Sequence, residues 1–419
     1  MCTAAFQAAR PFLILLCLLP PAHSDILIRD ITVIDVATNS AHPKRSILIH
    51  GDKIAAIGAR LPASKSIQIV DGTGKYIIPG LWDMSVHLRD RDQLAQYPAY
   101  GITSVRDMGS DFTRVKEWRA EIKSGKLLGP AVKTCGPAID GFPSQFPWLP
   151  VRLIRSPNDA RAAFDNLDDQ NVDFFGILPR LPRDAYFALI ERARKWYSSV
   201  AGDVPATVSA FEAVDARQRS IDHMSGILLA CSSEERRLRE PRSLALERND
   251  REGFDFAEAV ALQTFSTQKA DLLFERMARF ETRAVPTLVK LRALPGEKDI
   301  YPKLAQLLVR MHRAGVGILS GSDNEKSEAL HDELELLVAA GLTPADALRS
   351  ATIEPAKFFD TTETMGSVDK GKAADLVLLD ADPLTDIRNT RKISGVIVAG
   401  KYLPKARLTV IRAQAKAAN

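Results

Sequence analysis

Apolar and polar positions alternate over short runs at both ends of the chain, whereas the middle alternates short apolar runs with longer amphipathic stretches. Period-two runs bounded by turn residues predict β-strands. At the two ends of the chain such runs cover residues 26–36, 46–49, 54–57, 67–70, 374–379, 393–398 and 408–411. We therefore expect one small β-domain that is assembled from both ends of the chain.

The middle of the chain alternates strand-like and helical patterns. Strands are expected at residues 104–106, 174–178, 206–208, 221–222, 284–289 and 317–320. Helices are expected at residues 160–167, 183–196, 304–314 and 333–340, the last ending at Gly341, with Thr343-Pro344 starting the next. Such alternation over this length predicts a (β/α)8 TIM-type barrel. The expected division is residues 25–78 and 361–419 for the β-domain and 79–360 for the barrel.

Residues 1–24 have the pattern of a signal peptide. Arg10 precedes the apolar run 11–20, and Ala22-His23-Ser24 provides small residues where a signal peptidase cleaves. A buried first helix is the alternative, but Pro20-Pro21 would stop it abruptly. We expect export to the periplasm or the medium. No later stretch has about 20 uninterrupted apolar residues, so no membrane span is expected after cleavage.

Composition narrows the choice of partners. The 419 residues carry a formal net charge of +4, with Lys and Arg spread along the chain rather than clustered. Because nucleic-acid binding needs a basic stripe, we expect no nucleic-acid partner. Cleavage after Ser24 leaves Cys135 and Cys231. An oxidising compartment would permit a disulfide between them, but two separate buried thiols fit the sequence equally well.

Three residues lie where expected strands end, which is where a TIM-type barrel carries its catalytic groups. His87 shares one face of its strand with Asp83 and Ser85. His223 ends the short strand that runs into Gly226, and Asp323 follows the apolar run that begins at Gly317. Imidazole can bind a metal, and a carboxylate can act as a ligand or a general base. Singly, each could instead be a structural hydrogen-bonding residue or a turn cap.

Several ordered segments carry a family resemblance. They are Pro79–Leu88, Gly101–Gly109, Ser220–Gly226, Pro286–Val289, Gly321–Asp323, His331–Leu337 and Gly371–Pro383. With these segments the chain resembles the amidohydrolase superfamily, in particular its imidazolonepropionase-like and exported dipeptidase-like branch. The resemblance implies a (β/α)8 barrel with a small β-sandwich built from both termini. It also implies hydrolysis of C–N bonds, in amides or peptide-like molecules, by metal-activated water.

The resemblance also implies a metal centre that this sequence does not complete. The first His of the expected His-x-His pair is Ser85, the expected carboxylated Lys is Gly176, and the expected fifth-strand His is Ser209. The retained metal ligands are His87, His223 and Asp323. Since a hydroxyl is a poor zinc ligand, we expect at most one zinc or other divalent ion, and no binuclear centre.

Three functions remain open on this basis. The chain could be a catalytically inactive relative that binds a ligand or acts as a scaffold. It could be a hydrolase with an altered site, in which Asp323 is the base and His223 polarises a carbonyl. It could also carry out different chemistry in the same pocket. In each case the expected partner is a small-molecule or peptide-like ligand, and an oligomer is compatible with the sequence.

The loop 135–148, rich in Pro and aromatic residues, could line the mouth of the barrel or pack as a surface loop.

Overall fold

The computed structural model describes residues 25–63, 67–294 and 300–418. The expected signal peptide, residues 1–24, lies outside the described residues. Strand β1 (Ile26–Asp35) begins directly after it.

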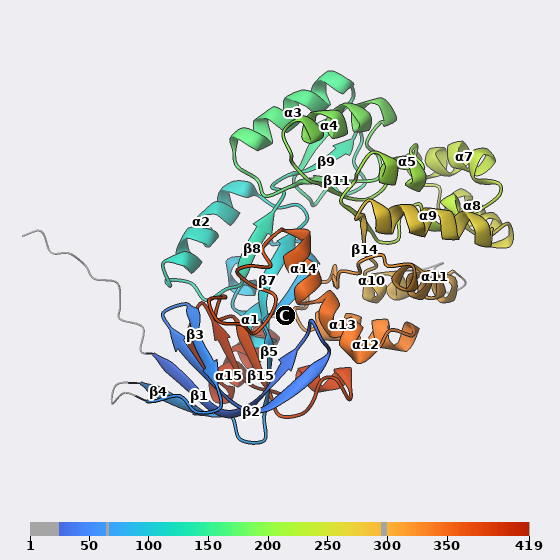
Figure 1. Ribbon diagram of the computed structural model, residues 1–419. Coiled ribbons are helices and arrows are strands. Elements are labelled where there is room, and N and C mark those ends of the chain that lie inside the picture. Colours follow the sequence, from blue (N-terminus) through green and yellow to red (C-terminus); the bar gives the residue numbers. More distant parts are fainter. Residues whose placement is uncertain (1–24, 64–66, 295–299, 419) are drawn as a thin grey trace, which may run out of the picture.

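Both ends of the chain contribute to one mixed sheet, in which blue and red segments lie side by side in Figure 1. Its strands are β1, β2 (Ser40–His50), β3 (Lys53–Gly58), β4 (Gln68–Asp71), β5 (Tyr76–Pro79), β15 (Leu376–Leu379), β16 (Ile393–Val398) and β17 (Lys401–Pro404). Strand β5 pairs antiparallel with β15, which joins the two ends of the chain. Apolar side chains on one face of these strands, among them Ile28, Ile47 and Leu376, form the core of this small β-sandwich.

Parallel strands form the barrel in the middle of the chain. They are β6 (Leu81–Val86), β7 (Ile102–Asp107), β8 (Ala131–Thr134), β11 (Phe175–Ile177), β12 (Val200–Gly202), β13 (Ser220–Asp222) and β14 (Arg283–Val285), with β9 (Ala138–Gly141) and β10 (Val151–Ile154) as an extension beside β11. The eighth position is the extended segment 317–320. Its Leu319 N–H donates to Ala284 of β14 (2.9 Å), and its Ser320 carbonyl accepts from Met84 of β6 (2.8 Å). The expected fold class is therefore confirmed.

Helices such as α2 (Phe112–Lys123), α3 (Pro157–Asp169), α4 (Arg183–Lys195), α9 (Thr267–Arg279) and α12 (Ala329–Ala340) cover the outside of the barrel strands in an arc (Figure 1). The other described helices are η1 (Arg91–Gln93), α1 (Gln96–Ala99), α5 (Ala210–Asp215), α6 (Ile227–Ala230), α7 (Glu235–Glu247), α8 (Arg251–Gln263), α10 (Leu288–Ala293), α11 (Tyr301–Arg313), α13 (Pro344–Ser350), α14 (Ile353–Phe358), η2 (Ile387–Arg391) and α15 (Lys405–Ala418), of which α15 lies beside the sheet. The expected start of α13 is confirmed, because the Thr343 side chain accepts the Asp346 N–H.

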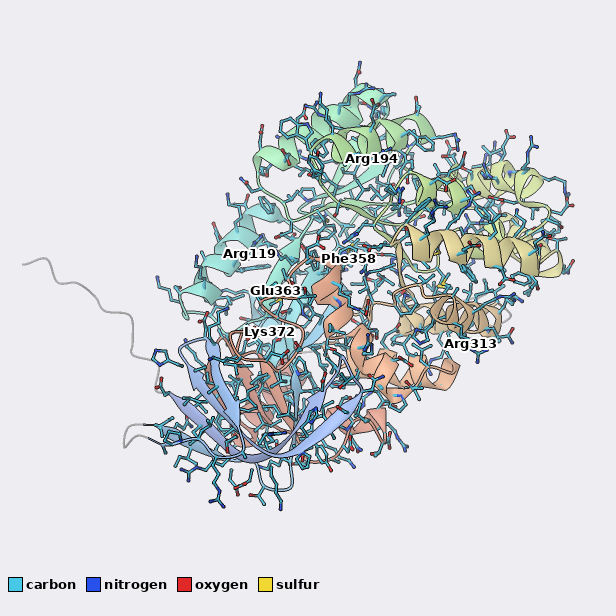
Figure 2. All side chains as sticks on the ribbon, viewed as in Figure 1. Arg119, Arg194, Arg313, Phe358, Glu363 and Lys372 are labelled. Carbon is cyan, nitrogen blue, oxygen red and sulfur yellow. The ribbon has the colours of Figure 1, made fainter. Side chains whose placement is uncertain are left out.

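The inside of the barrel is filled with side chains. Trp82, Met84, Met108, Cys135, Phe174 and Phe358 belong to one buried cluster. Figure 2 labels Phe358 near the centre of the molecule, whereas Arg119, Arg194 and Arg313 lie on outer helices. A packed interior is usual for this barrel, so a ligand has room only beyond the ends of the strands.

Three sequence predictions about elements were wrong. Residues 408–411 lie in α15 and not in a strand, because only Leu408 and Ile411, three residues apart, are buried there. Residues 206–208 lie in a turn, and the fifth barrel strand is β12. The strand expected at 284–289 ends at Val285, because Thr287 has a left-handed φ of 49° and α10 begins at Leu288.

The two remaining thiols are separate. Cys135 and Cys231 are both buried and free in the described structure, so of the two expectations the separate thiols hold. Among the described helices, none combines the length and the apolar character needed to cross a membrane.

Candidate functional site

The ends of three strands bring His87, His223 and Asp323 together. The Asp323 side chain is 5% exposed; its Oδ1 lies 3.3 Å from His87 Nε2 and its Oδ2 lies 3.7 Å from His223 Nε2. The three residues that the sequence singled out as retained ligands thus share one site at the carboxyl end of the barrel.

Backbone strain marks two of these positions. His223 and Asp323 have left-handed φ values of 57° and 42°, which cost about 1–3 kcal/mol each in residues other than glycine. Neighbouring strands hold them there: His223 N–H donates to Val285 (2.9 Å) and Asp323 N–H donates to Ser85 (2.8 Å). The strained turns aim both side chains at the same point, as is common at binding and catalytic sites.

A fourth residue of the site, Lys290, was missed by the sequence analysis. Its Nζ forms an ion pair and a hydrogen bond with Asp323 Oδ2. Lys290 lies on α10, one residue beyond the family-like segment that ends at Val289. Its proximity to that segment was the only signal in the sequence, and nothing in it indicated that the side chain turns back toward Asp323.

Glu333 positions the helix that carries Lys290. The two oxygens of this buried carboxyl accept the N–H groups of Leu288 and Val289, each at 2.9 Å. These are N–H groups of the first turn of α10, which have no partner within the helix. Glu333 on α12 and the turn at Thr287 together fix the direction in which Lys290 leaves the helix.

Electrostatics favour a charged Asp323 and a neutral His223. Burial raises the pKa of Asp323, but the hydrogen bond from His87 and the charge of Lys290 outweigh it and hold that pKa well below its usual range. Burial and the neighbouring Lys290 lower the pKa of His223 to about 3. The other ring nitrogen of His223, Nδ1, lies 2.8 Å from the Thr287 hydroxyl. The site therefore holds an ammonium–carboxylate pair beside a neutral imidazole.

Two of the positions at which the sequence predicted a replaced ligand lie in the barrel wall. Ser85 is buried in β6, and its carbonyl accepts the Asp323 N–H. Gly176 lies in β11, where an added Cβ would stand 2.6 Å from Cys135 Sγ and 3.1 Å from Cys135 Cβ. Cys135 thus fills the space that a longer side chain at position 176 would need.

The third replaced position was assigned wrongly. Ser209 is not on the fifth strand: it is the N-cap of α5, where its hydroxyl accepts the Phe211 N–H (3.2 Å) and donates to Glu235. The fifth strand ends at Gly202, which is followed by Asp203. Asp203 is 7% exposed and lines the site together with His223 and Lys290.

The described side chains do not fit a bound metal. In the part of the chain that the structure describes, no three or more His, Cys, Asp or Glu side chains are arranged so that they could hold a metal ion. Asp323, which would have to bind any metal ion at this site, already forms an ion pair with the Lys290 ammonium. The ammonium would repel a metal cation bound to the same carboxylate.

A cavity of about 430 Å³ opens beside these residues. Its wall includes His223, Lys290, Asp203 and Phe146. A smaller cavity of about 30 Å³, lined in part by the same four residues, continues toward His87 and Trp148. The Trp148 ring meets His87 edge-on at 5.3 Å between centroids, so the aromatic loop 135–148 does border the mouth of the barrel.

A filled (β/α)8 barrel with a polar site at the carboxyl ends of its strands is an enzyme-type scaffold. The sequence profile of the Amidohydrolase family matches residues 290–403. Adenine deaminase 2 of Jannaschia sp. (strain CCS1) is 40% identical over 86 residues, which are 20% of this chain and 14% of that protein. Imidazolonepropionase of Fusobacterium nucleatum is 31% identical over 77 residues, 17% of this chain and 19% of that protein.

Solved structures extend the likeness to the whole barrel. A Xaa-Pro dipeptidase with methionine bound in its active site has a TM-score of 0.71 and 21% identity, over 91% of this chain and 100% of that one. At that identity the likeness concerns the fold, whereas the matches to the curated relatives span only small parts of those proteins. Together these findings confirm the resemblance to the amidohydrolase superfamily.

Proposed function

We propose that this chain is a non-hydrolytic amidohydrolase relative that binds a small organic molecule in the cavity at the mouth of its barrel. The observation that carries the proposal is the ion pair between Lys290 and the buried Asp323. In this site a side-chain ammonium supplies the positive charge that balances the carboxylate. The charge balance of the site is thus complete without a metal ion.

The altered hydrolase, the second function considered, fits this geometry less well. A general base works best when its pKa lies near the operating pH, and the pKa of Asp323 is held far below that. His223 would have to polarise a carbonyl, but its Nδ1 faces Thr287 and its Nε2 faces Asp323. The Asp323 carboxylate and the His223 imidazole therefore face each other and their neighbours rather than a substrate carbonyl.

The cavity supports a binding role. A volume of about 430 Å³ with apolar walls and a few convergent polar groups is typical of small-molecule sites. In the Xaa-Pro dipeptidase of the same fold, methionine occupies the active site. We place the ligand of this chain at the corresponding end of the barrel, against Lys290, His223 and Asp203.

Metal analysis and hydrolysis assays test the proposal. The protein is purified from medium containing zinc and manganese, its metal content is measured, and it is assayed on N-acyl amino acids and dipeptides. We expect far less than one metal per chain and no hydrolysis. One zinc per chain that is lost in Asp323→Ala would overturn the proposal. So would hydrolysis without metal that depends on Asp323 and His223, because that result would establish the altered hydrolase.

We also propose export of the protein with removal of residues 1–24. The first strand of the sheet begins at Ile26, so cleavage after Ser24 would leave every strand intact. Intact-mass measurement of the secreted protein should give a chain that starts at Asp25. A secreted or cytosolic chain that retains residues 1–24 would contradict it.

A further inference from the structure

The charges that face the cavity are mostly paired within the protein. Arg242 Nε lies 2.5 Å from Glu258, and Lys290 is bonded to Asp323. Arg251 lies 2.8 Å from Asp255. These cations and acids balance one another before any ligand enters.

Asp203 is the exception among the buried acids that line the cavity in the described residues. It follows β12 directly and is 7% exposed. The Ser225 hydroxyl, which accepts the Val204 N–H (2.9 Å), lowers the pKa of this carboxyl. In the described part of the chain, Asp203 forms no salt bridge with Lys, Arg or His, whereas Glu258, the other buried acid of this wall, is paired with Arg242. Asp250, which also lines the cavity, is exposed and caps helix α8. A buried carboxyl without a cation is energetically unfavourable when ionised.

The surroundings of Asp203 add to this imbalance. The nearby Asp222 and Asp140 act on it as further negative charges. Asp222 is paired with Arg106 at 2.6 Å. Asp140 accepts two backbone N–H groups with one oxygen, and its other oxygen is buried without a partner. Burial and these acids raise the pKa of Asp203 to about 8, although the charge of Lys290 lowers it. Lys290 is itself bonded to Asp323 and forms no salt bridge with Asp203. This end of the barrel is therefore short of positive charge on the side of Asp203.

We propose that the cavity binds an organic amine, whose ammonium donates hydrogen bonds to Asp203 while its apolar body lies between Met224, Leu228, Phe254 and Leu291. The ammonium supplies the cation that the protein itself does not place there, and charge-assisted hydrogen bonds are the strong ones. This inference rests on the proposed function, because a site whose charges are balanced without a metal ion leaves the cavity to an organic ligand.

An organic carboxylate is the competing ligand class, because Lys290 also faces the cavity. Lys290 is already neutralised by Asp323, so a carboxylate there would have to break an existing pair or share it. It would also come close to the uncompensated Asp203. An amine gains an ion pair without breaking one.

A matched series of probes tests the ligand class: 3-phenylpropylamine, 3-phenylpropan-1-ol and 3-phenylpropanoate share one apolar body and differ in the end group. Calorimetric titration of the mature protein should show at least tenfold tighter binding of the amine than of the alcohol, and the weakest binding for the carboxylate. In Asp203→Asn the preference for the amine over the alcohol should disappear, while the alcohol still binds. In the control Asp375→Asn, which removes a carboxyl of the β-sandwich that accepts the Ala399 N–H, the preference should remain.

Tightest binding of the carboxylate, or an unchanged amine preference in Asp203→Asn, would overturn the inference. So would the absence of binding by the amine. None of these results bears on metal content or hydrolysis, so the proposed function stands or falls by its own measurements. The thermal midpoint of each variant shows whether it is folded before it is titrated.

Discussion

Replacing Lys290 with Met should destabilise the protein, although Lys290 is neither an apolar core residue nor fully buried. The change leaves the Asp323 carboxylate, 5% exposed, without its ammonium. Breaking a buried ion pair by removing one partner costs about 3–5 kcal/mol. Because His87 remains 3.3 Å from Asp323, we expect the lower end of that range, about 3 kcal/mol.

A double-mutant cycle separates the ion pair from loss of side-chain packing. In Lys290→Met/Asp323→Asn both charges are absent, so the double variant should be more stable than Lys290→Met alone by about 1–2 kcal/mol. The measurement is urea unfolding followed by tryptophan fluorescence and circular dichroism. The control is Lys326→Met, which changes an exposed lysine near the site and should alter stability by less than about 0.5 kcal/mol.

The pH dependence gives an independent check with a defined sign. Because the folded-state pKa of Asp323 is depressed, its contribution to stability is complete above its unfolded pKa of about 3.9 and is lost as the pH falls below it. The difference between wild type and Lys290→Met should therefore persist from pH 7 to pH 5 and shrink below about pH 4. The ion-pair argument is refuted if Lys290→Met costs less than about 1 kcal/mol, or if the double variant is as unstable as the single one.

Three further substitutions test other parts of the site. The folded-state pKa of Asp203, about 8, lies above the unfolded value of about 3.9, so its ionisation opposes folding increasingly from pH 4 to pH 8. Asp203→Asn should thus raise the free energy of unfolding at pH 8.5, by at most about 6 kcal/mol, and leave it unchanged near pH 4. The thermal midpoint at each pH measures the change. Gly176→Ala should cost about 1–3 kcal/mol in urea unfolding, because its Cβ would press on Cys135. Ser209→Ala should cost about 1–2 kcal/mol, because α5 loses its N-cap and Glu235 loses a hydrogen bond.

For each of these three substitutions, one result would contradict the prediction. An Asp203→Asn variant that is less stable than wild type at pH 8.5 would show that the carboxylate has a compensating partner. Gly176→Ala at wild-type stability would mean that Cys135 can move aside, and Gly176→Ala/Cys135→Ala should relieve the crowding if it cannot. A neutral Ser209→Ala, with Glu247→Ala as a surface control, would remove the argument that Ser209 is a structural cap.

Much of the fold could be read from residue patterns. The strands of the sheet and the helices α3, α4, α11 and α12 follow from period-two and helical spacing of apolar residues, because each needs only one face to be buried. The pattern failed where local signals were ambiguous. Residues 408–411 are apolar enough for a strand, but after the β16–β17 hairpin the chain packs two of them against the domain from one face of a helix.

The residues of the site also divide into those that sequence patterns located and those that they did not. His87, His223 and Asp323 were found because they end strands, and in a parallel barrel the strand ends converge. Ser209 was misplaced because the short strand-like run 206–208 was taken for the fifth strand, whereas β12 ends seven residues before Ser209. Asp203 could have been found by placing that strand correctly at residues 200–202.

The sequence by itself determined the scaffold, and it placed Ser85 and Gly176 at strand positions where the family resemblance predicts metal ligands. Both depend on which residue types stand at which strand positions. Only the tertiary structure decided which cation pairs with Asp323. Lys290 reaches Asp323 because Glu333, 43 positions further along the chain, holds the first turn of α10 in place. Such a contact depends on how one helix docks on another, and no local pattern of residues encodes that distance.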